Sequence, residues 1–164
     1  NFYFIESERY DLGAVLKKGA ELVKRKGIKC LVIDPFNKVK LKGTADMSIP
    51  DATMEYLAQI EAFAKKYDVL VIVVAHPTKM YKKDDGTMEE PTMYNIKGGG
   101  EWYDASYHGL LVHRNYTNNT VKVKVLKVKF QNLGQNQAEA HFTWNHASGD
   151  YHPQEGLDTN LPWE

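Results

Sequence analysis

Two polar side chains follow the two most apolar runs of the sequence, and they are the first candidates for chemistry. Asp34 ends the run 30–33, and His76 ends the run 69–75. An aspartate in such a place can hold Mg²⁺ or its water shell, and a histidine can donate a hydrogen bond to a phosphate oxygen. Ligands of open α/β sheets bind beyond the carboxyl ends of the strands, so both side chains are expected within one side-chain length of a shared cleft. The plainer alternative is that each residue only caps a buried strand.

A pair of lysines offers a second place for a phosphate. Val121, Val123 and Val125 alternate with polar residues, and strict alternation puts Lys127 and Lys129 on the valine face, beyond the end of the core. Two cations that project together suit a phosphate group. Lysines that protect a strand end from pairing are at least as common.

A run of glycines next to a lysine is the third candidate. Lys97 precedes Gly98, Gly99 and Gly100, and backbone N–H groups in such a run can approach a phosphate backbone closely. Glycine runs also occur simply as flexible loops.

The remaining signals limit the chemistry. No Gly-Lys is followed by Ser or Thr, so the sequence contains no Walker A phosphate loop, and we expect the isolated chain neither to hydrolyse ATP nor to bind it tightly. Five histidines fall on different expected elements, and we interpret them as structural: His108, His113, His141, His146 and His152.

The elements that must position these residues are those of an α/β protein. Apolar residues at three- and four-residue steps predict helices, and runs that are apolar at every position predict strands covered on both faces of a parallel sheet. The expected strands are 2–5, 30–33, 69–75 and 109–113, and the expected helices are 11–26, 48–66 and 101–105.

The last third of the sequence has the pattern of antiparallel strands. Residues 121–125 alternate with a period of two after a turn at 118–119, and 140–144 is their expected antiparallel partner. Two stretches, 38–49 and 81–100, have few apolar anchors, and we expect them to be poorly ordered loops.

The composition is that of one ordinary globular domain, and the net charge of zero gives the molecule no strong overall electrostatic field. The 164 residues include 21 Lys and Arg and 21 Asp and Glu, so a polyanion site must be local. A single cysteine, Cys30, excludes an intrachain disulfide framework and a CxxC metal site. The longest apolar stretch, 69–75, is far shorter than the roughly 20 residues of a membrane span, and Asn1 opens no leader pattern. These features predict a soluble, cytoplasmic protein with no membrane partner.

In combination, the segments resemble the carboxyl-terminal half of the RecA-like ATPase core of hexameric replicative DNA helicases, of the phage primase-helicase and Twinkle type. The resemblance rests on four motifs in order, which lie at 31–39, 71–79, 95–114 and 125–134. It covers nearly the whole chain, and it implies a partial RecA-like domain at 1–152 followed by a tail at 153–164.

The resemblance also implies roles. Asp34 would be the Walker B aspartate beside Mg²⁺ and ATP in the full-length protein, and His76 would sense the γ-phosphate. Lys97 and the three glycines would lie on a central-channel loop that tracks single-stranded DNA. The loops 38–49 and 81–100 would form the channel of the ring. Lys127 and Lys129 would reach into the nucleotide site of a neighbouring subunit of a homohexamer. A primase is a further implied partner.

Two departures from that family qualify these roles. Its members usually carry an arginine finger where this sequence has Lys129, and a lysine provides a point charge without the planar bidentate fork. They also place the P-loop and the general-base glutamate upstream of the first strand here, so the sequence is either a fragment of a longer helicase or a degenerate relative that does not hydrolyse nucleotide. A first residue other than Met favours the fragment.

Two other functions stay open. One is a non-catalytic RecA-fold module that oligomerises or binds single-stranded DNA, and the other is a RecA-like ATPase of recombination or signalling. A Gly-Lys-Ser/Thr loop encoded just upstream of Asn1 would decide for an enzyme.

Overall fold

The computed structural model describes residues 1–6, 10–40, 46–80 and 89–154. The chain divides into two compact units. The first comprises Asn1–Met80 and Tyr94–Ala105, and the second comprises Tyr81–Met93 and Ser106–Glu164.

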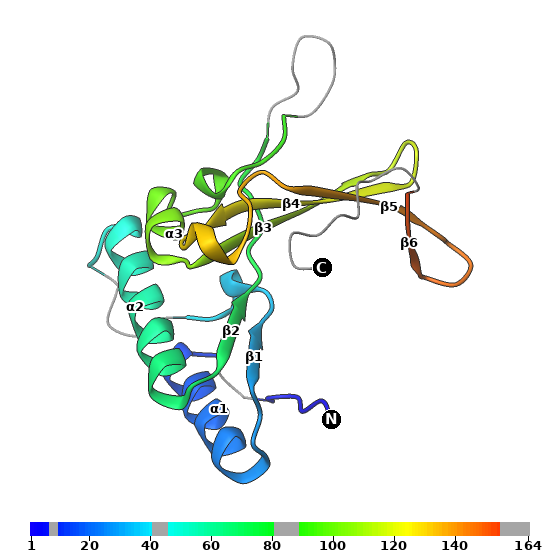
Figure 1. Cartoon of the computed structure of the whole chain (residues 1–164). Coiled ribbons are helices and arrows are strands. Elements are labelled where there is room, and N and C mark those ends of the chain that lie inside the picture. Colours follow the sequence, from blue (N-terminus) through cyan, green and yellow to red (C-terminus); the bar gives the residue numbers. More distant parts are fainter. Residues whose placement is uncertain (7–9, 41–45, 81–88, 155–164) are drawn as a thin grey trace. The chain divides into compact units, whose positions relative to one another are not determined.

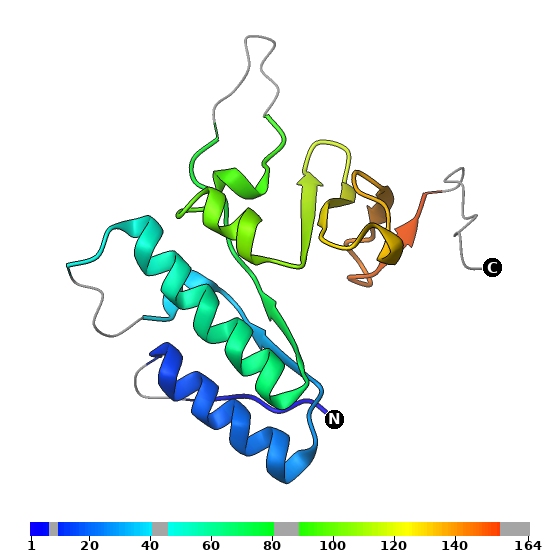
Figure 2. The same cartoon turned by 60° about the vertical axis from the view of Figure 1, so that its left-hand side comes forward.

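The first unit contains a parallel pair of strands with two long helices. β1 (Cys30–Ile33) and β2 (Leu70–Val73) pair in parallel, in register from Cys30 opposite Leu70 to Ile33 opposite Val73. α1 (Leu12–Lys26) precedes β1, and α2 (Ile49–Tyr67) connects the two strands. Both helices lie on the same side of the strand pair (Figure 2).

The ends of both helices follow the capping chemistry of the sequence. The Asp11 carboxylate accepts from the Ala14 N–H and begins α1, and Gly27 ends it in the left-handed region with φ 65°. Ser48 begins α2 by accepting from the Asp51 N–H, and Asp68 ends it with φ 51°. The helices predicted at 11–26 and 48–66 are therefore confirmed.

The core of this unit lies between the helices and one face of the strands. Leu31, Phe63 and Val69 form its buried centre, and Leu16 and Val23 of α1 pack against it. The other face of the strand pair is not covered in the described part of the chain, where Val32 is 54%, Leu70 58% and Ile72 43% exposed. The predicted cover over this second face is not found among the described residues, because α1 and α2 both lie on the other side.

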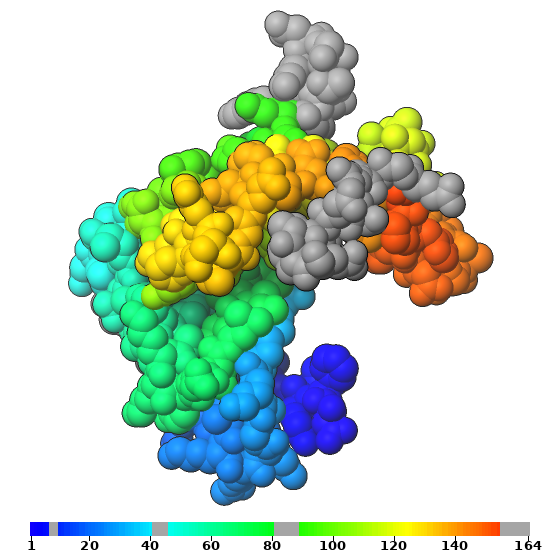
Figure 3. Space-filling model, in the orientation of Figure 1, coloured from blue at the N-terminus to red at the C-terminus, as the bar shows by residue number. Residues whose placement is uncertain are grey.

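The predicted strand at 2–5 does not form. Residues 1–6 take no regular structure, and only Ile5 packs against the core. Phe2 and Phe4 are 97% and 91% exposed, and Figure 3 shows the amino-terminal residues as a dark blue projection beside the surface of α1 and β1. The aromatic residues predicted a strand by propensity, but no neighbouring strand pairs with them among the described residues.

The second unit is an antiparallel sheet in the order β3 (His108–Asn115), β4 (Thr120–Val128), β5 (Glu139–Trp144) and β6 (Tyr151–Pro153) (Figure 1). Val121 lies opposite Phe142, which confirms the antiparallel pair predicted at 121–125 and 140–144. The strand predicted at 109–113 forms as part of β3, but in the described residues it pairs only with β4, antiparallel. The connection between them is too short for a parallel crossover.

The two predicted loops are partly structured. Phe36–Lys38 forms the 3₁₀ helix η1, Met93–Asn95 forms the 3₁₀ helix η2, and α3 (Gly100–Ala105) confirms the short helix predicted at 101–105. Residues 41–45 and 81–88 lie outside the described residues, as does 155–164 of the predicted tail. Among the helices that are described, none has the length and apolar character needed to cross a membrane.

Candidate functional site

Asp34 and His76 follow neighbouring parallel strands at the same edge of the pair. Asp34 comes directly after Ile33, which lies opposite Val73, and His76 comes shortly after Val73. Beyond the strands the pairing continues, because the Val74 N–H donates to the Ile33 carbonyl at 2.9 Å. The predicted placement at the carboxyl ends of adjacent strands is therefore correct, and both side chains are exposed there. A shared cleft stays a prediction.

This edge of the strand pair suits a metal ion whose ligands are mostly water molecules and substrate oxygens, with few from the protein. In the described part of the chain, no three His, Cys, Asp or Glu side chains are grouped as a metal site would need. Mg²⁺ is commonly held by one or two carboxylates, with waters and substrate phosphates completing its octahedron. The exposed Asp34 carboxylate fits one such contact, either to the ion or to its water shell.

The segment after His76 is joined directly to the segment before Lys97. Pro77 forms an antiparallel bridge with Ile96, and the Thr78 N–H donates to the Asn95 carbonyl at 2.7 Å. The candidate phosphate contact and the candidate DNA contact are therefore linked through a few backbone atoms.

The glycine run is packed and is not a free loop. Gly98 and Gly99 have φ of 103° and 57°, backbone conformations that residues with a side chain rarely adopt. A Cβ at Gly98 would lie under 3.0 Å from Thr53 of α2, 2.8 Å from Cγ2 and 2.9 Å from Cβ. Gly98 is thus the residue that lets the Lys97 backbone approach α2, and the simple flexible-loop interpretation does not hold for it.

The two lysines of β4 do not continue the valine alternation. A β-bulge shifts the register between Gly109 and Leu110, so Gly109 lies opposite Lys127 whereas Leu110 lies opposite Val125. Val128 is buried in consequence, which strict alternation from Val121 does not allow. A Cβ at Gly109 would meet the Met93 sulfur, so a larger residue there would require the Met93 side chain to move. The bulge therefore places Lys127 on the face opposite the valines, so the part of the prediction that puts the lysines on the valine face is wrong. A shared face for Lys127 and Lys129 themselves stays a prediction.

Lys129 lies just past the end of β4 and is exposed. Its N–H donates to the Tyr107 carbonyl at 2.9 Å, and its Nζ lies 4.3 Å from the centre of the Tyr107 ring. This cation–π contact leaves the ammonium group accessible while it orients the side chain.

The sequence-based search missed one planar group in the second unit. The Arg114 guanidinium lies 3.7 Å from the Trp144 ring centre and 4.8 Å from that of Tyr116, and Arg114 Nε is buried without a hydrogen-bond partner among the described residues. His146 contacts Trp144 at 3.9 Å between ring centres. Stacked guanidinium and indole planes are suited to flat heteroaromatic rings. The signal was weak because Arg114 and Trp144 come from different strands, whose register the sequence does not reveal.

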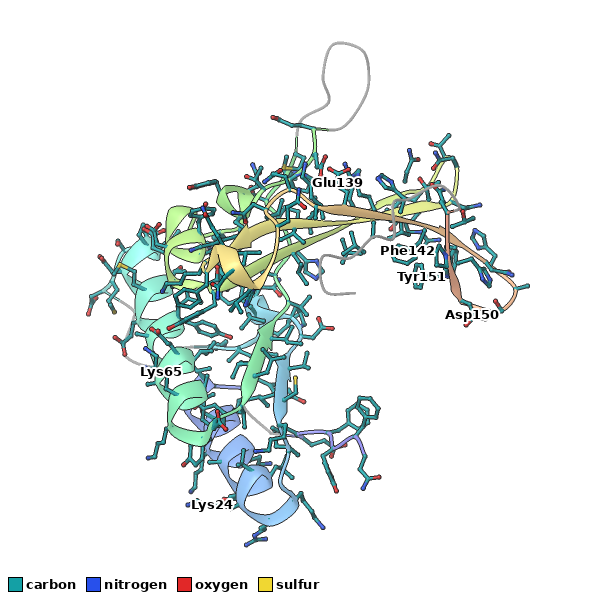
Figure 4. All side chains as sticks on the ribbon, in the orientation of Figure 1. Lys24, Lys65, Glu139, Phe142, Asp150 and Tyr151 are labelled. Atoms are coloured by element: carbon teal, nitrogen blue, oxygen red, sulfur yellow. The ribbon has the colours of Figure 1, made fainter. Side chains whose placement is uncertain are left out.

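A charged network covers another part of the same sheet. Lys122 Nζ lies 2.6 Å from Glu90 Oε2, and Lys124 Nζ lies 3.0 Å from Glu139 Oε1. The hydrogen bond from Lys124 lowers the pKa of Glu139 and raises that of Lys124. His141 Nε2 lies 3.4 Å from Glu139 Oε2. In Figure 4, Glu139 stands near the start of β5, away from Phe142 and Tyr151. This network pairs the β4 lysines nearest the sheet centre with carboxylates.

Comparisons with known proteins support the helicase resemblance. No family model matches the sequence. It is 30% identical, over an alignment of 158 positions that covers 92% of this chain, to the Twinkle homolog protein, chloroplastic/mitochondrial, of Arabidopsis thaliana. Its fold is similar to that of a DnaB-like replicative helicase whose structure describes interactions with primase, with a TM-score of 0.72 at 13% identity over 90% of this chain. The predicted resemblance and the RecA-like α/β fold class are thereby confirmed.

The likeness covers only part of each relative. The chain spans 22% of the length of the Twinkle homolog and 37% of the DnaB-like chain. The domain boundary at residue 152, the roles of the individual site residues and a cytoplasmic location stay predictions.

Proposed function

We propose that this chain is the carboxyl-terminal half of the ATPase core of an NTP-driven, ring-forming replicative DNA helicase that translocates on single-stranded DNA. The observation that carries the proposal is the linked edge of the first unit. Asp34 and His76 end adjacent parallel strands, and the Pro77–Ile96 bridge joins the His76 segment to the Lys97 loop.

Each residue at this edge has a chemical task in the proposal. The Asp34 carboxylate contacts Mg²⁺ or its waters, and the His76 ring donates to a terminal phosphate oxygen. A change in the position of His76 is transmitted to Ile96 through the bridged backbone. Lys97 then gains or loses its contact with a DNA phosphate. In this way the nucleotide state controls the affinity for single-stranded DNA.

Lys129 acts in trans in this proposal. Its exposed ammonium group, oriented by Tyr107, stabilises charge on the nucleotide of a neighbouring subunit. Arginine fingers supplied in trans are typically worth on the order of 10³ to 10⁵ in rate, and lysine lacks their bidentate geometry. Lys127 supplies a second cation close by.

A mixing experiment tests action in trans. Full-length subunits with Lys129→Ala are combined with full-length subunits that lack the phosphate-loop lysine of the upstream segment. Recovery of DNA-stimulated hydrolysis at intermediate ratios is expected, because one intact interface then forms between two defective subunits. Absence of recovery at every ratio contradicts the proposal, and Lys129→Arg, which should keep or improve activity, is the matched control.

The second candidate function is a RecA-fold module without turnover that oligomerises or binds single-stranded DNA. It is favoured by one specific observation, that Lys129 stands where the resembled family usually carries an arginine finger. DNA-stimulated hydrolysis by the full-length protein excludes it, whereas DNA binding without hydrolysis supports it. A RecA-like ATPase of recombination is distinguished by a strand-displacement assay on forked DNA, which a replicative helicase unwinds.

A further inference from the structure

An aromatic cluster in the first unit lies between the segment that follows Asp34 and the Lys97 loop. Phe36, Tyr56 and Trp102 form it, with ring centres 4.7 Å apart for Phe36 and Trp102 and 5.2 Å apart for Phe36 and Tyr56. Both contacts are edge to face at 77°, a favourable geometry for aromatic pairs. Tyr56 and Trp102 are among the most buried residues of the unit.

Trp102 reaches the Lys97 loop through a hydrogen bond. Its indole Nε1–H donates to the Lys97 carbonyl at 3.0 Å, and its backbone N–H points at the Gly99 carbonyl at 3.3 Å. The Gly99 N–H in turn donates to the Ile96 carbonyl at 2.8 Å. The orientation of one buried ring thus sets the position of the Lys97 peptide group.

Phe36 anchors the opposite end of the cluster. It follows Asp34 by two residues, and its N–H donates to the Val74 carbonyl at 2.8 Å, beyond the ends of both strands. Because the Phe36 ring packs edge to face against both Tyr56 and Trp102, a shift of Phe36 changes its contact with Trp102. A change in the backbone around Asp34 therefore has a route to Lys97 that does not pass through His76.

We infer that Trp102 is a positioning residue that couples the segment after Asp34 to the Lys97–Gly100 loop through Phe36. The inference deepens the proposed function and rests on it for the two ligands that are coupled, a Mg-nucleotide and single-stranded DNA. The positioning itself rests only on the contacts above, so it is testable without either ligand. Two routes then lead from the strand ends to Lys97, one through the Pro77–Ile96 bridge and one through the aromatic cluster.

Amide hydrogen exchange on the 164-residue chain tests the positioning. Trp102→Phe keeps a ring against Phe36 and Tyr56 but removes the N–H donor. Loss of a neutral hydrogen bond raises exchange in a peptide covering 97–100 by roughly two- to tenfold. Tyr67→Phe is the matched control, because it removes one polar group from an α2 ring that packs on Phe63 and leaves the cluster intact. Unchanged exchange at 97–100 in Trp102→Phe overturns the inference.

The coupling itself is tested by a double-mutant comparison. Phe36→Leu keeps apolar volume but removes the edge-to-face contact, and it is expected to raise exchange at 97–100 as well. If Trp102 transmits the effect, adding Phe36→Leu to Trp102→Phe changes the loop little further. Independent, multiplying effects of the two substitutions refute transmission through Trp102 even if each variant folds and melts cooperatively.

A binding measurement on the full-length protein separates failure of the inference from failure of the proposed function. The ratio of single-stranded DNA affinities with and without Mg-nucleotide is expected to fall at least about threefold in Phe36→Leu, and to stay unchanged in Tyr67→Phe. A ratio equal to that of the wild type in Phe36→Leu contradicts the coupling. A wild-type protein that does not bind single-stranded DNA contradicts the proposed function, while the exchange experiment still decides the role of Trp102.

Discussion

Replacing Gly98 by alanine tests whether the Lys97 loop is held against α2. The new methyl group meets two separate costs. With φ of 103°, the backbone lies where an L-residue is strained by about 1–2 kcal/mol. The methyl would also lie 2.8 Å from Thr53 Cγ2 and 2.9 Å from Thr53 Cβ, an overpacking that typically costs about 1–3 kcal/mol. Gly98→Ala is therefore expected to lower the free energy of unfolding by about 2–5 kcal/mol.

Gly99→Ala is a control that carries only one of these costs. Its φ of 57° is also left-handed, but the nearest atom to an added Cβ is Glu101 Oε2 at 4.0 Å. The loss of chain entropy in the unfolded state is the same for both substitutions and cancels in their difference. The difference between the two variants is therefore the packing term, about 1–3 kcal/mol, together with the additional backbone strain at the larger φ of Gly98.

Urea unfolding followed by circular dichroism at the helical minimum measures this difference, because the α-helices described in the structure all belong to the first unit. A second background tests the cause directly. Thr53→Ala removes Oγ1 and Cγ2, two of the three Thr53 atoms that an added Cβ would meet, so the cost of Gly98→Ala should fall by about 1 kcal/mol in that background. Equal costs for Gly98→Ala and Gly99→Ala, or a cost that Thr53→Ala does not change, would show that the loop is not packed on α2 as described.

Three further predictions concern ligands and pH. Lys97→Ala in the full-length protein should weaken single-stranded DNA binding similarly for all sequences and reduce the slope of log affinity against log salt by about 0.7, and an unchanged slope would remove Lys97 from the interface. The 164-residue chain should show no submicromolar binding of Mg-ATP in calorimetry, because it contains no phosphate loop; tight binding would mean that the missing motif is dispensable. The hydrogen bond from Lys124 lowers the pKa of Glu139, so its contribution to stability is present above the pKa of the unfolded state and is lost as pH falls through the lower folded value. Thermal unfolding at several pH values should show this acid-side loss weakened by added salt and absent in Glu139→Gln; identical profiles for both proteins would disprove it.

The local structure of this protein was predictable wherever a residue acts on its own backbone neighbours. Asp11 and Ser48 begin helices through bonds to residues three positions away, and Gly27 ends one because it tolerates a left-handed conformation. Alternation in β4 likewise predicted its pairing with β5. These signals need no knowledge of the rest of the fold.

Prediction failed where the deciding partner is distant in the sequence. The bulge between Val125 and Lys127 lies opposite Gly109 and Leu110 of β3, and the Met93 side chain occupies the space in front of Gly109. The contact between Arg114 and Trp144 depends on the register of two strands, and the hydrogen bond from Trp102 to Lys97 depends on how the glycines turn the chain. Strict alternation placed Lys127 and Lys129 on the valine face because it does not allow for the bulge between Val125 and Lys127.

The exposed face of β1 and β2 carries apolar residues that contacts among the described residues do not explain. Val32, Leu70 and Ile72 are apolar although the described residues leave about half of each side chain in contact with solvent. Full burial of such a side chain stabilises a protein by about 1.5–3 kcal/mol. Covering these three side chains would therefore add several kcal/mol to the free energy of unfolding, beyond what the described contacts contribute. Strands that face water on one side normally alternate with polar residues, and these do not. These residue types are typical of strands covered on both faces, and under the proposed function an upstream segment of the RecA-like core would supply the second layer. Because Asp34 and His76 follow these same strands, such a layer would cover the strands that position them.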